Sequence, residues 1–308
     1  ATLQQHGLDD MAAFLACDGY RSSAEVTAQW LDQVWPRMET QGVDGLFGFY
    51  IGADEKDSKN NILTIGQGGL TLGQKDYYVD ADPETAKVRE AYVAYIQKLA
   101  AHVGFSQDDA ARMAQDVMRI ETRLAKASRS MTELRDPEAN YNKMSYEQLK
   151  KDFPGIKWDA YFQNFGISGL KDVVVGQPEA IHEVERVLAE ETPEALQNVY
   201  LWHAINMASG YVDDESRNIA FSFWGTTLSG RTQDRPRWKR AVSSVDGFLG
   251  EALGQLYVAK YFPPAAKERM VKLVANLQQA LGERIDVQDW MTPETKKVAR
   301  EKLDAFYV

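Results

Sequence analysis

Helix-start signals recur along this chain and constrain its fold more than any other feature. Three of them combine a side-chain acceptor, a proline and an acid: Asp82-Pro83-Glu84, Thr192-Pro193-Glu194 and Thr292-Pro293-Glu294. The acceptor caps backbone N–H groups, the proline fits the first helical turn, and the acid complements the positive end of the helix dipole. A helix is therefore predicted to begin at each of these positions.

Other starts rely on serine. Ser22 with Glu25, and Ser145 with Gln148, have the spacing of capping boxes, and Ser106 precedes two aspartates. The most regular apolar stripe at helical spacing runs from Val245 to Tyr261 and stops before two prolines, which cannot continue a helix. A similar stripe follows in residues 270–281.

The helix over residues 245–261 is predicted to be part of the core. On that expectation, replacing Leu253 or Leu256 by Ala should cost about 2 to 5 kcal/mol of stability, as for buried leucines generally.

One region departs from the helical pattern. Residues 46–51 and 62–65 are short apolar runs rich in aromatic or β-branched side chains, and a polar stretch, 54–61, separates them. This predicts a β-hairpin over about 45–66. The glycine-rich stretch that follows, residues 66–73, indicates a loop with close backbone packing. The predicted fold is mainly α, a helical lobe with one short β-hairpin, and with more helix than the roughly 30–35% of average proteins.

Charge and cysteine content exclude several classes of protein. The 35 basic and 45 acidic side chains give a net charge of −10, which disfavours bulk nucleic-acid binding. A basic segment, Arg231 to Arg240, is more typical of an ion-pair network or an interdomain contact than of a nucleic-acid site. Cys17 is the one cysteine and excludes a disulfide framework; an inert thiol is the expected reading. No apolar run reaches the roughly 18–20 residues of a transmembrane segment.

Most catalytic templates fail on residue identity. The chain has no Gly-x-Ser-x-Gly, Walker or Cys-x-x-Cys motif, and Thr71 replaces the third glycine of a dinucleotide-binding loop in residues 66–73. A zinc-peptidase helix needs histidines at i and i+4, but Arg186 stands four residues after His182. We therefore interpret this segment as a solvated helix face with Glu185 and Arg186 outward.

The remaining candidates favour structural roles. His203 lies among aromatic and apolar residues and is predicted to be a core histidine bonded to the backbone. Adjacent acids point in different directions and are expected to serve solvation and helix dipoles; they are Asp9-Asp10, Asp108-Asp109, Glu190-Glu191 and Asp213-Asp214-Glu215. The residues alone assign no catalytic, cofactor-binding or metal-binding side chain.

Three segments together resemble one family. Residues 46–54 with 66–78 are similar to the hairpin and following loop in the N-terminal region of the neprilysin and endothelin-converting-enzyme type zinc metallopeptidases. Residues 237–263 resemble that family's long linker helix, and Asp289-Trp290-Met291, with Lys296 and Lys297, fits the next one. The resemblance runs from about Met38 to Leu303. Ala241 stands where animal members have cysteine, so the chain resembles a bacterial member without disulfides.

The resemblance implies that the zinc site and the substrate-restricting lobe belong to different parts of the complete enzyme. The family's zinc helix, its third zinc ligand and its substrate-binding Asn-Ala strand map onto nothing in this chain, so no cofactor is expected here, although zinc is implied for the complete enzyme. Residues 1–235 are expected to form the helical, substrate-restricting lobe, and residues 236–308 to form linker helices leading toward an absent catalytic domain. Expected partners are that missing half and peptide substrates, with neither nucleic acid nor a transmembrane segment.

Two hypotheses about function follow. In the first, the chain is the noncatalytic N-terminal part of a neprilysin-like zinc metalloendopeptidase that cleaves small peptides in an enclosed cavity, and it is inactive alone. In the second, it is an exported helical binding or scaffold protein that lacks peptidase activity. The family resemblance implies a periplasmic or otherwise extracytoplasmic location. The first hypothesis also predicts an exposed apolar patch along the linker helix and the last segment, including Trp290, Met291, Phe306 and Tyr307.

Overall fold

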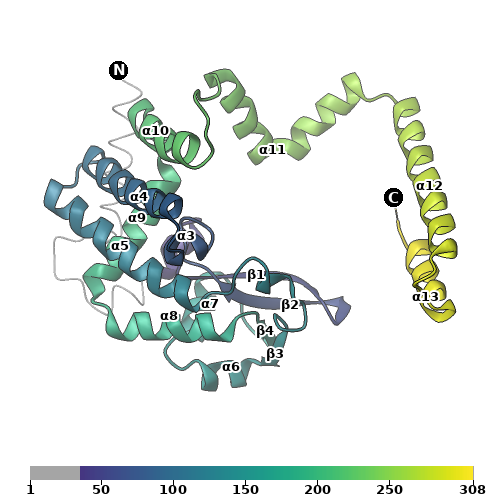
Figure 1. Cartoon of the computed structure of the whole chain (residues 1–308), viewed down its shortest axis with the longest axis horizontal. Coiled ribbons are helices and arrows are strands. Elements are labelled where there is room, and N and C mark those ends of the chain that lie inside the picture. The colour runs from purple at the N-terminus through teal and green to yellow at the C-terminus, as the bar shows by residue number, and fades with distance from the viewer. Residues whose placement is uncertain (1–34, 308) are drawn as a thin grey trace. The chain divides into compact units, whose positions relative to one another are not determined.

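A computed structural model describes residues 35–307 of the chain, and it divides into two compact units, residues 1–234 and 235–308. Helices dominate both units (Figure 1). The predicted capping box at Ser22 and the cysteine at position 17 lie outside the described residues. Among residues 35–307, no helix is both long and apolar enough to cross a bilayer.

Unit 1 contains one small sheet. Its strands are β1 (Phe47–Asp54), β2 (Asp57–Gln67), β3 (Asn142–Ser145) and β4 (Asp172–Val175), in the order β1-β2-β4-β3. β1 and β2 form the predicted antiparallel hairpin, while β4 pairs parallel with β2 and antiparallel with β3. The prediction of a single hairpin was therefore incomplete, because two further strands of four residues each extend it into a sheet.

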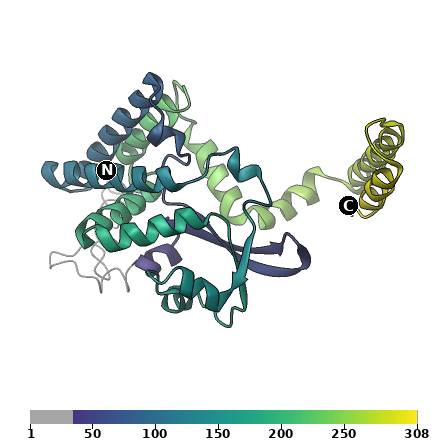
Figure 2. The ribbon, with the colours of Figure 1, turned by 60° about the horizontal axis from the view of Figure 1, so that its bottom comes forward.

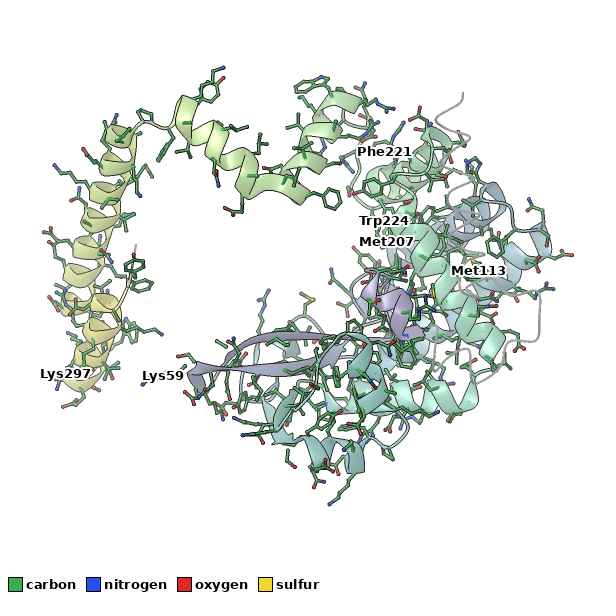
Figure 3. All side chains as sticks on the ribbon, turned by 180° about the vertical axis from the view of Figure 1, so that it is seen from behind. Lys59, Met113, Met207, Phe221, Trp224 and Lys297 are labelled. Carbon is green, nitrogen blue, oxygen red and sulfur yellow. The ribbon has the colours of Figure 1, made fainter. Side chains whose placement is uncertain are left out.

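The hairpin turn is also tighter than the polar stretch 54–61 suggested. β1 ends at Asp54 and β2 already begins at Asp57, so the turn residues are Glu55 and Lys56. Polar residues can continue a strand here because the far end of the hairpin is exposed, and Figure 3 shows Lys59 near its tip.

The helices of unit 1 pack on the sheet and on one another (Figures 1 and 2). In chain order they are α3 (Asp76–Val79), α4 (Pro83–His102), α5 (Gln107–Ala127), α6 (Tyr146–Asp152), α7 (Trp158–Asn164), α8 (Pro178–Glu190), α9 (Pro193–Ala208) and α10 (Asp214–Ala220), with a 3-10 turn η2 (Glu133–Arg135) and a π-helical segment η3 (Phe221–Thr227). α4, α5 and α9 contact each other, and α8 lies against α5 and β2.

The predicted helix caps are present. The side chains of Asp82, Ser106, Ser145, Thr192 and Thr292 each accept a hydrogen bond from the backbone N–H three residues later, at the starts of α4, α5, α6, α9 and α13. Each cap satisfies a donor that the helix itself leaves free. These five predictions of local structure are confirmed.

The core of unit 1 is rich in aromatic side chains. Trp158, Tyr92, Trp202, Phe153 and Phe162 are all less than 2% exposed. Aromatic rings from separate segments meet in it; Phe47 of β1, for example, lies 5.5 Å from Trp158 and 5.1 Å from Tyr161 between ring centroids. Burial of large rings supplies much of the stabilisation of such a core.

Unit 2 consists of three helices, α11 (Arg237–Tyr261), α12 (Pro264–Val287) and α13 (Pro293–Asp304). α11 is the predicted helix over 245–261, but it begins eight residues earlier and bends at Leu249, whose backbone is non-helical. Gly247 and Gly250 flank the bend, and glycine is a common cause of helix kinks. α12 and α13 contact each other and bury Ile285 and Leu303.

Candidate functional site

The histidine helix does not form a metal site. On α8, Arg186 is exposed and donates to Glu183, while His182 Nδ1 lies 3.0 Å from Glu185 Oε2. Within residues 35–307, no three His, Cys, Asp or Glu side chains are grouped so that they could hold a metal ion. The described residues therefore do not fit the zinc that the family resemblance implies.

Part of the expectation for this segment was wrong. Arg186 points outward as predicted, but the Glu185 side chain is only 14% exposed. Its carboxylate accepts the backbone N–H of Gly155 at 2.6 Å, so it joins α8 to the segment before α7 instead of facing water.

Some adjacent acids also have partners that sequence reasoning missed. Asp213 caps α10 and contacts His102 Nε2 of α4 at 3.1 Å, with its side chain 4% exposed. The Glu191 carboxylate, 10% exposed, contacts Arg119 and Arg123 of α5. These acids hold helices together, so the expectation of solvation was wrong for both, whereas the expected role at a helix start is confirmed for Asp213.

His203 on α9 is a core residue, as predicted. It is 5% exposed, and its Nδ1 donates to the backbone carbonyl of Asp44 at 2.7 Å. Its Nε2 lies 3.2 Å from Glu121 Oε1 of α5, a contact that the sequence did not reveal. Burial alone lowers the pKa of His203, but the hydrogen bond and charge of Glu121 more than offset it, so the pKa is raised.

Glu121 is fully buried and is the centre of a polar cluster. Its carboxylate accepts hydrogen bonds from the hydroxyls of Thr71 at 2.6 Å, Tyr78 at 2.7 Å and Tyr92 at 3.1 Å. The sequence carried one signal for this burial. Val117, Ile120 and Leu124 follow the i, i+3, i+7 spacing of an apolar face, and position 121 falls on that face.

A cavity of about 240 Å³ lies beside this cluster. Its lining comes from residues 44–48, the glycine loop and α9: Asp44, Gly45, Phe47, Gly48, Gln67, Gly68, Gly69, Leu70, Thr71, Gly73 and His203. The predicted close backbone packing of the loop is confirmed. A Cβ on Gly68 would lie 2.9 Å from the backbone of Gly48, and Gly69 has a φ of 71°.

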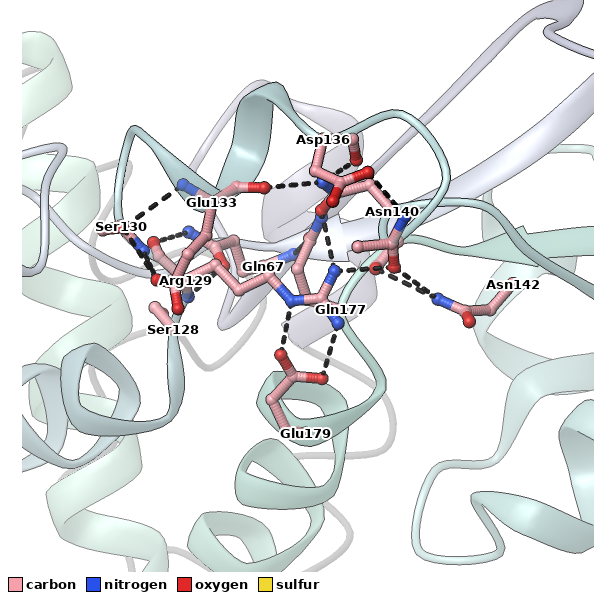
Figure 4. A network of polar contacts seen from close by, with 12 residues as sticks. Gln67, Ser128, Arg129, Ser130, Glu133, Asp136, Asn140, Asn142, Gln177 and Glu179 are labelled. Carbon is pink, nitrogen blue, oxygen red and sulfur yellow. Dashed lines mark hydrogen bonds and ion pairs between the residues drawn. The ribbon is translucent and has the colours of Figure 1, made fainter.

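A second polar network fixes the C-terminal end of strand β2, at Gln67, opposite to the hairpin tip (Figure 4). Gln67 exchanges two hydrogen bonds with the backbone of Arg129, and its own N–H donates to Gln177. The Arg129 guanidinium donates to Glu179 at 2.6 Å and to the side chain of Asn140 at 3.0 Å. The network joins the ends of β2 and α5 to the start of α8.

An ion pair between Asp54 and Lys143 holds the tip of the hairpin to β3. Asp54, 2% exposed, accepts from Lys143 of β3 at 2.7 Å and from the Tyr141 hydroxyl at 2.6 Å. The Lys143 and Tyr141 hydrogen bonds hold the pKa of Asp54 well below its usual range. A second cavity, about 210 Å³, is lined by both hairpin strands, Leu134, residues 140–141 and residues 174–177.

Glu39 is an acid that the sequence did not single out. Its carboxylate accepts from the indole N–H of Trp35 and from the hydroxyl of Tyr161. Burial raises the pKa of Glu39 to about 7, against the opposing effect of these hydrogen bonds. A Cβ on Gly45 would collide with this carboxylate, so a larger residue at position 45 would require the Glu39 side chain to move.

The basic segment Arg231–Arg240 spans the boundary between the units and enters the first turn of α11. Arg231 lies over the Phe221 ring of η3, and Arg240 donates to the backbone of Arg235. Trp238 is 65% exposed with the Lys239 ammonium over its ring.

The apolar residues of unit 2 are largely exposed. α11 has no buried residue. The prediction that Leu253 and Leu256 belong to the core was wrong, because their exposed fractions are 37% and 71%. Exposed aromatic and aliphatic side chains of α11 and α12 include Phe248, Leu249, Tyr257, Tyr261, Leu273, Leu277 and Leu281. Figure 3 shows side chains standing out around these helices. Within the expected last patch, Trp290, Phe306 and Tyr307 are exposed, and Met291 is partly buried.

Comparison with known proteins agrees with these features. Residues 1–308 match the model of peptidase family M13. Mouse endothelin-converting enzyme 1 is 29% identical over 266 residues, which are 85% of this chain and 34% of the mouse protein. An endothelin-converting enzyme homolog of Locusta migratoria is 28% identical over 272 residues, or 37% of its length. The chain thus spans about a third of the length of these relatives.

Solved structures show the same fold. The zinc metalloprotease ZMP1 of Mycobacterium tuberculosis, determined with an inhibitor, superposes with a TM-score of 0.88 and 31% identity over 98% of this chain and 45% of that one. PEPO of Lactobacillus rhamnosis shares the fold with a TM-score of 0.78 at 20% identity, over 98% of this chain and 46% of its own. Family match and fold together show that the chain belongs to peptidase family M13, the neprilysin-type zinc metallopeptidases, and corresponds to their N-terminal region.

Proposed function

We propose that this chain is the noncatalytic N-terminal part of an M13 zinc metalloendopeptidase that cleaves small peptides, and that the zinc site is supplied by sequence not present here. One observation carries the proposal. The 25-residue helix α11 buries none of its residues, although its apolar side chains recur at helical spacing. Among residues 235–307 nothing buries these side chains, and soluble monomers rarely expose apolar patches of more than a few hundred Å², which supports a further surface of the complete enzyme packed against them.

The two units take different roles in this proposal. Residues 1–235 form the lobe that restricts which substrates enter, and residues 236–308 form the linker helices that lead to the catalytic domain. The division between the compact units at residues 234 and 235 supports these boundaries. Unit 1 has its own aromatic core, as a lobe of fixed shape requires, whereas unit 2 presents its apolar side chains.

Catalysis is assigned to the absent half because the described residues offer no zinc site. Arg186 occupies the position where a zinc-peptidase helix needs its second histidine, and no alternative ligand group exists within residues 35–307. The expected contribution of this chain is therefore to enclose the substrate and to support the catalytic half, with peptides as the substrates of the complete enzyme.

A second candidate is an exported helical binding or scaffold protein without peptidase activity. The self-contained core of unit 1 favours this alternative, because that unit has the buried interior of an autonomous domain. We place either protein in the periplasm or another extracytoplasmic compartment of a bacterium. Support for a bacterial origin comes from the similarity to the mycobacterial protein and from the single cysteine, at position 17, which leaves no intrachain disulfide. The compartment is what the family resemblance implies.

The experiment is to read the coding sequence downstream of Val308 and to express the two parts separately and together. We expect a His-Glu-x-x-His helix downstream, no stoichiometric zinc and no peptide cleavage with this chain alone, and chelator-sensitive cleavage when both parts are combined. A variant of the downstream part with its zinc histidines replaced is the matched control. Zinc-dependent cleavage by this chain alone, or no gain from its complement, would contradict the proposal.

A further inference from the structure

Glu121 and His203 form a deeply buried polar contact in unit 1, and the function proposed above does not use it. Their side chains are 0% and 3% exposed, and they join α5 to α9 at 3.2 Å. The protonation states of the two groups follow from the directions of the hydrogen bonds around them.

Three hydroxyl groups must donate to Glu121. The Tyr78 hydroxyl already accepts the backbone N–H of Leu72 at 2.9 Å, so its own proton is free for the carboxylate. The Tyr92 hydroxyl accepts the indole N–H of Trp202 at 2.8 Å, which likewise leaves its proton for Glu121. The Thr71 hydroxyl supplies the third bond. The backbone N–H of Thr71 lies 3.4 Å from the same carboxylate as a fourth donor. An ionised carboxylate has about four acceptor sites, so four donors fit the ionised form of Glu121.

His203 lies beside the same carboxylate. The backbone carbonyl of Asp44 can only accept, so Nδ1 of His203 must carry a proton. Nε2 lies 3.2 Å from Glu121 Oε1, and because the donors around Glu121 fit an ionised carboxylate, a lone pair on Nε2 would face a negatively charged oxygen; Nε2 therefore carries a proton as well. A ring protonated on both nitrogens is an imidazolium, and its charge balances that of the carboxylate. Glu39 and Asp44 are the other acids whose charges act on this ring, and the Tyr200 ring contacts it.

We propose that Glu121 and His203 form a buried imidazolium–carboxylate pair that positions both walls of the 240 Å³ cavity. On one wall, Glu121 holds the glycine loop through the hydroxyl of Thr71 and through Tyr78, which binds the Leu72 amide. On the other wall, His203 holds the carbonyl of Asp44. The β1–β2 pairing of Phe47 with Gln67 and of Gly48 with Gly66 fixes one end of the cavity, and the ion pair connects Asp44 to residues 71–72 away from that pairing.

This inference goes beyond the proposed function, since it holds whether the cavity serves a peptidase or a binding protein. Glu121 and His203 are positioning residues here, because they act on the cavity through other residues. Burying an ion pair between two helices costs the desolvation free energy of both charges, which close geometry and additional hydrogen bonds must offset. The Glu121 cluster has the 3.2 Å contact and the additional hydrogen bonds.

The charge state is tested on the unaltered chain by NMR of ¹⁵N-labelled histidine between pH 5 and 9. We expect both ring nitrogens of His203 to carry protons at neutral pH, with N–H signals that exchange slowly with water. His182, whose side chain is 47% exposed, is the internal control for fast exchange. An unprotonated Nε2 on His203 at neutral pH would mean a neutral pair and would overturn the proposal.

The positioning role is tested by amide hydrogen exchange in His203→Gln, Glu121→Gln and the double variant. In His203→Gln we expect exchange to rise about tenfold or more in residues 44–48 and also in residues 68–72, which Glu121 holds and His203 does not. The control is His102→Gln, which removes another histidine–carboxylate contact, that with Asp213, and should leave both segments unchanged.

The double variant keeps the test decisive if a single variant fails to fold. Removing one charge strands the other in the core, while removing both does not, so the double variant should be more stable than the sum of the single losses predicts. Strictly additive losses, or exchange that rises in residues 44–48 alone, would contradict the proposed ion pair.

Discussion

Two leucines, one in each unit, show how differently the parts of this chain use apolar side chains. Leu196 on α9 is 0% exposed and belongs to the core of unit 1, whereas Leu256 on α11 is 71% exposed. The apolar residues of α11 recur at helical spacing, whereas the buried residues of α9 are consecutive from Val199 to Ile205. Periodicity therefore identified α11 and its apolar side, but it did not say what covers that side.

The difference shows which unit has a buried core of its own. The described part of unit 1 holds several buried polar groups in internal networks, as the clusters around Glu121 and Arg129 show. Unit 2 buries only a few side chains, among them Ile285 and Leu303 between α12 and α13. Its folding into a stable unit should depend on a partner more than that of unit 1 does.

The largest expected effect contrasts the two leucines directly. Leu196→Ala should lower the free energy of unfolding by about 2 to 5 kcal/mol, because it leaves a cavity in a packed core. Leu256→Ala should change it by less than about 0.5 kcal/mol in this chain alone, because the side chain is already in water. Urea denaturation followed by circular dichroism measures both. Equal losses would place α11 in a core and remove the contrast.

The next effect concerns Glu39, at the edge of the unit 1 core. Its pKa of about 7 is raised above the value of 4.5 for an exposed glutamate, so folding favours the protonated form. The resulting stabilisation is at most about 3 kcal/mol. It is complete below pH 4.5 and is lost as the pH rises through about 7. We expect Glu39→Gln to flatten the stability of unit 1 over this pH range. An unchanged pH dependence in the variant would show that Glu39 titrates normally.

A smaller effect is expected from surface ion pairs. Arg123 of α5 contacts Glu183, Glu190 and Glu191, and its side chain is 24% exposed. Arg123→Gln should lower stability by about 1 kcal/mol, which thermal unfolding can detect. The matched variant in unit 2 is Arg300→Gln, which removes the more exposed pair with Asp286 and should have a smaller effect. The reverse order would mean that unit 2 depends on its charges more than unit 1.

The smallest effect on stability should accompany a clear effect on association. Phe248→Ser, at a residue 77% exposed on α11, should leave unfolding almost unchanged while reducing binding of a hydrophobic dye and light scattering by the chain. Tyr211→Ser is the control, because Tyr211 is 71% exposed but lies in unit 1. If both variants behave alike, the exposed rings of unit 2 have no special role.

Local signals predicted much of this fold. The caps at Asp82, Thr192 and Thr292 lie where expected, because a cap involves only a few neighbouring residues. The strands β3 and β4 were missed because each is four residues long, and β4 pairs with β2 from about 110 residues away. Pairing across such a distance leaves no mark in a short sequence window.

The polar sites were harder to predict. His203 was correctly expected to bond to the backbone, since a histidine within an apolar run needs a buried partner. Glu121 was missed because in sequence it resembles any acid on an amphipathic helix, and its three hydroxyl partners come from residues 71, 78 and 92. Only the assembled tertiary structure brings those donors together.

Hydrogen–deuterium exchange of this chain, alone and joined to the downstream half, tests whether unit 2 is stabilised by the catalytic half. We expect amides of α11 and α12 to exchange quickly in the chain alone and to become protected when the catalytic half is present, while the core of α5 and α9 stays protected in both states. A downstream variant that does not bind this chain serves as the control. Equal protection of α11 in the isolated chain and in the complete protein would show that unit 2 needs no partner.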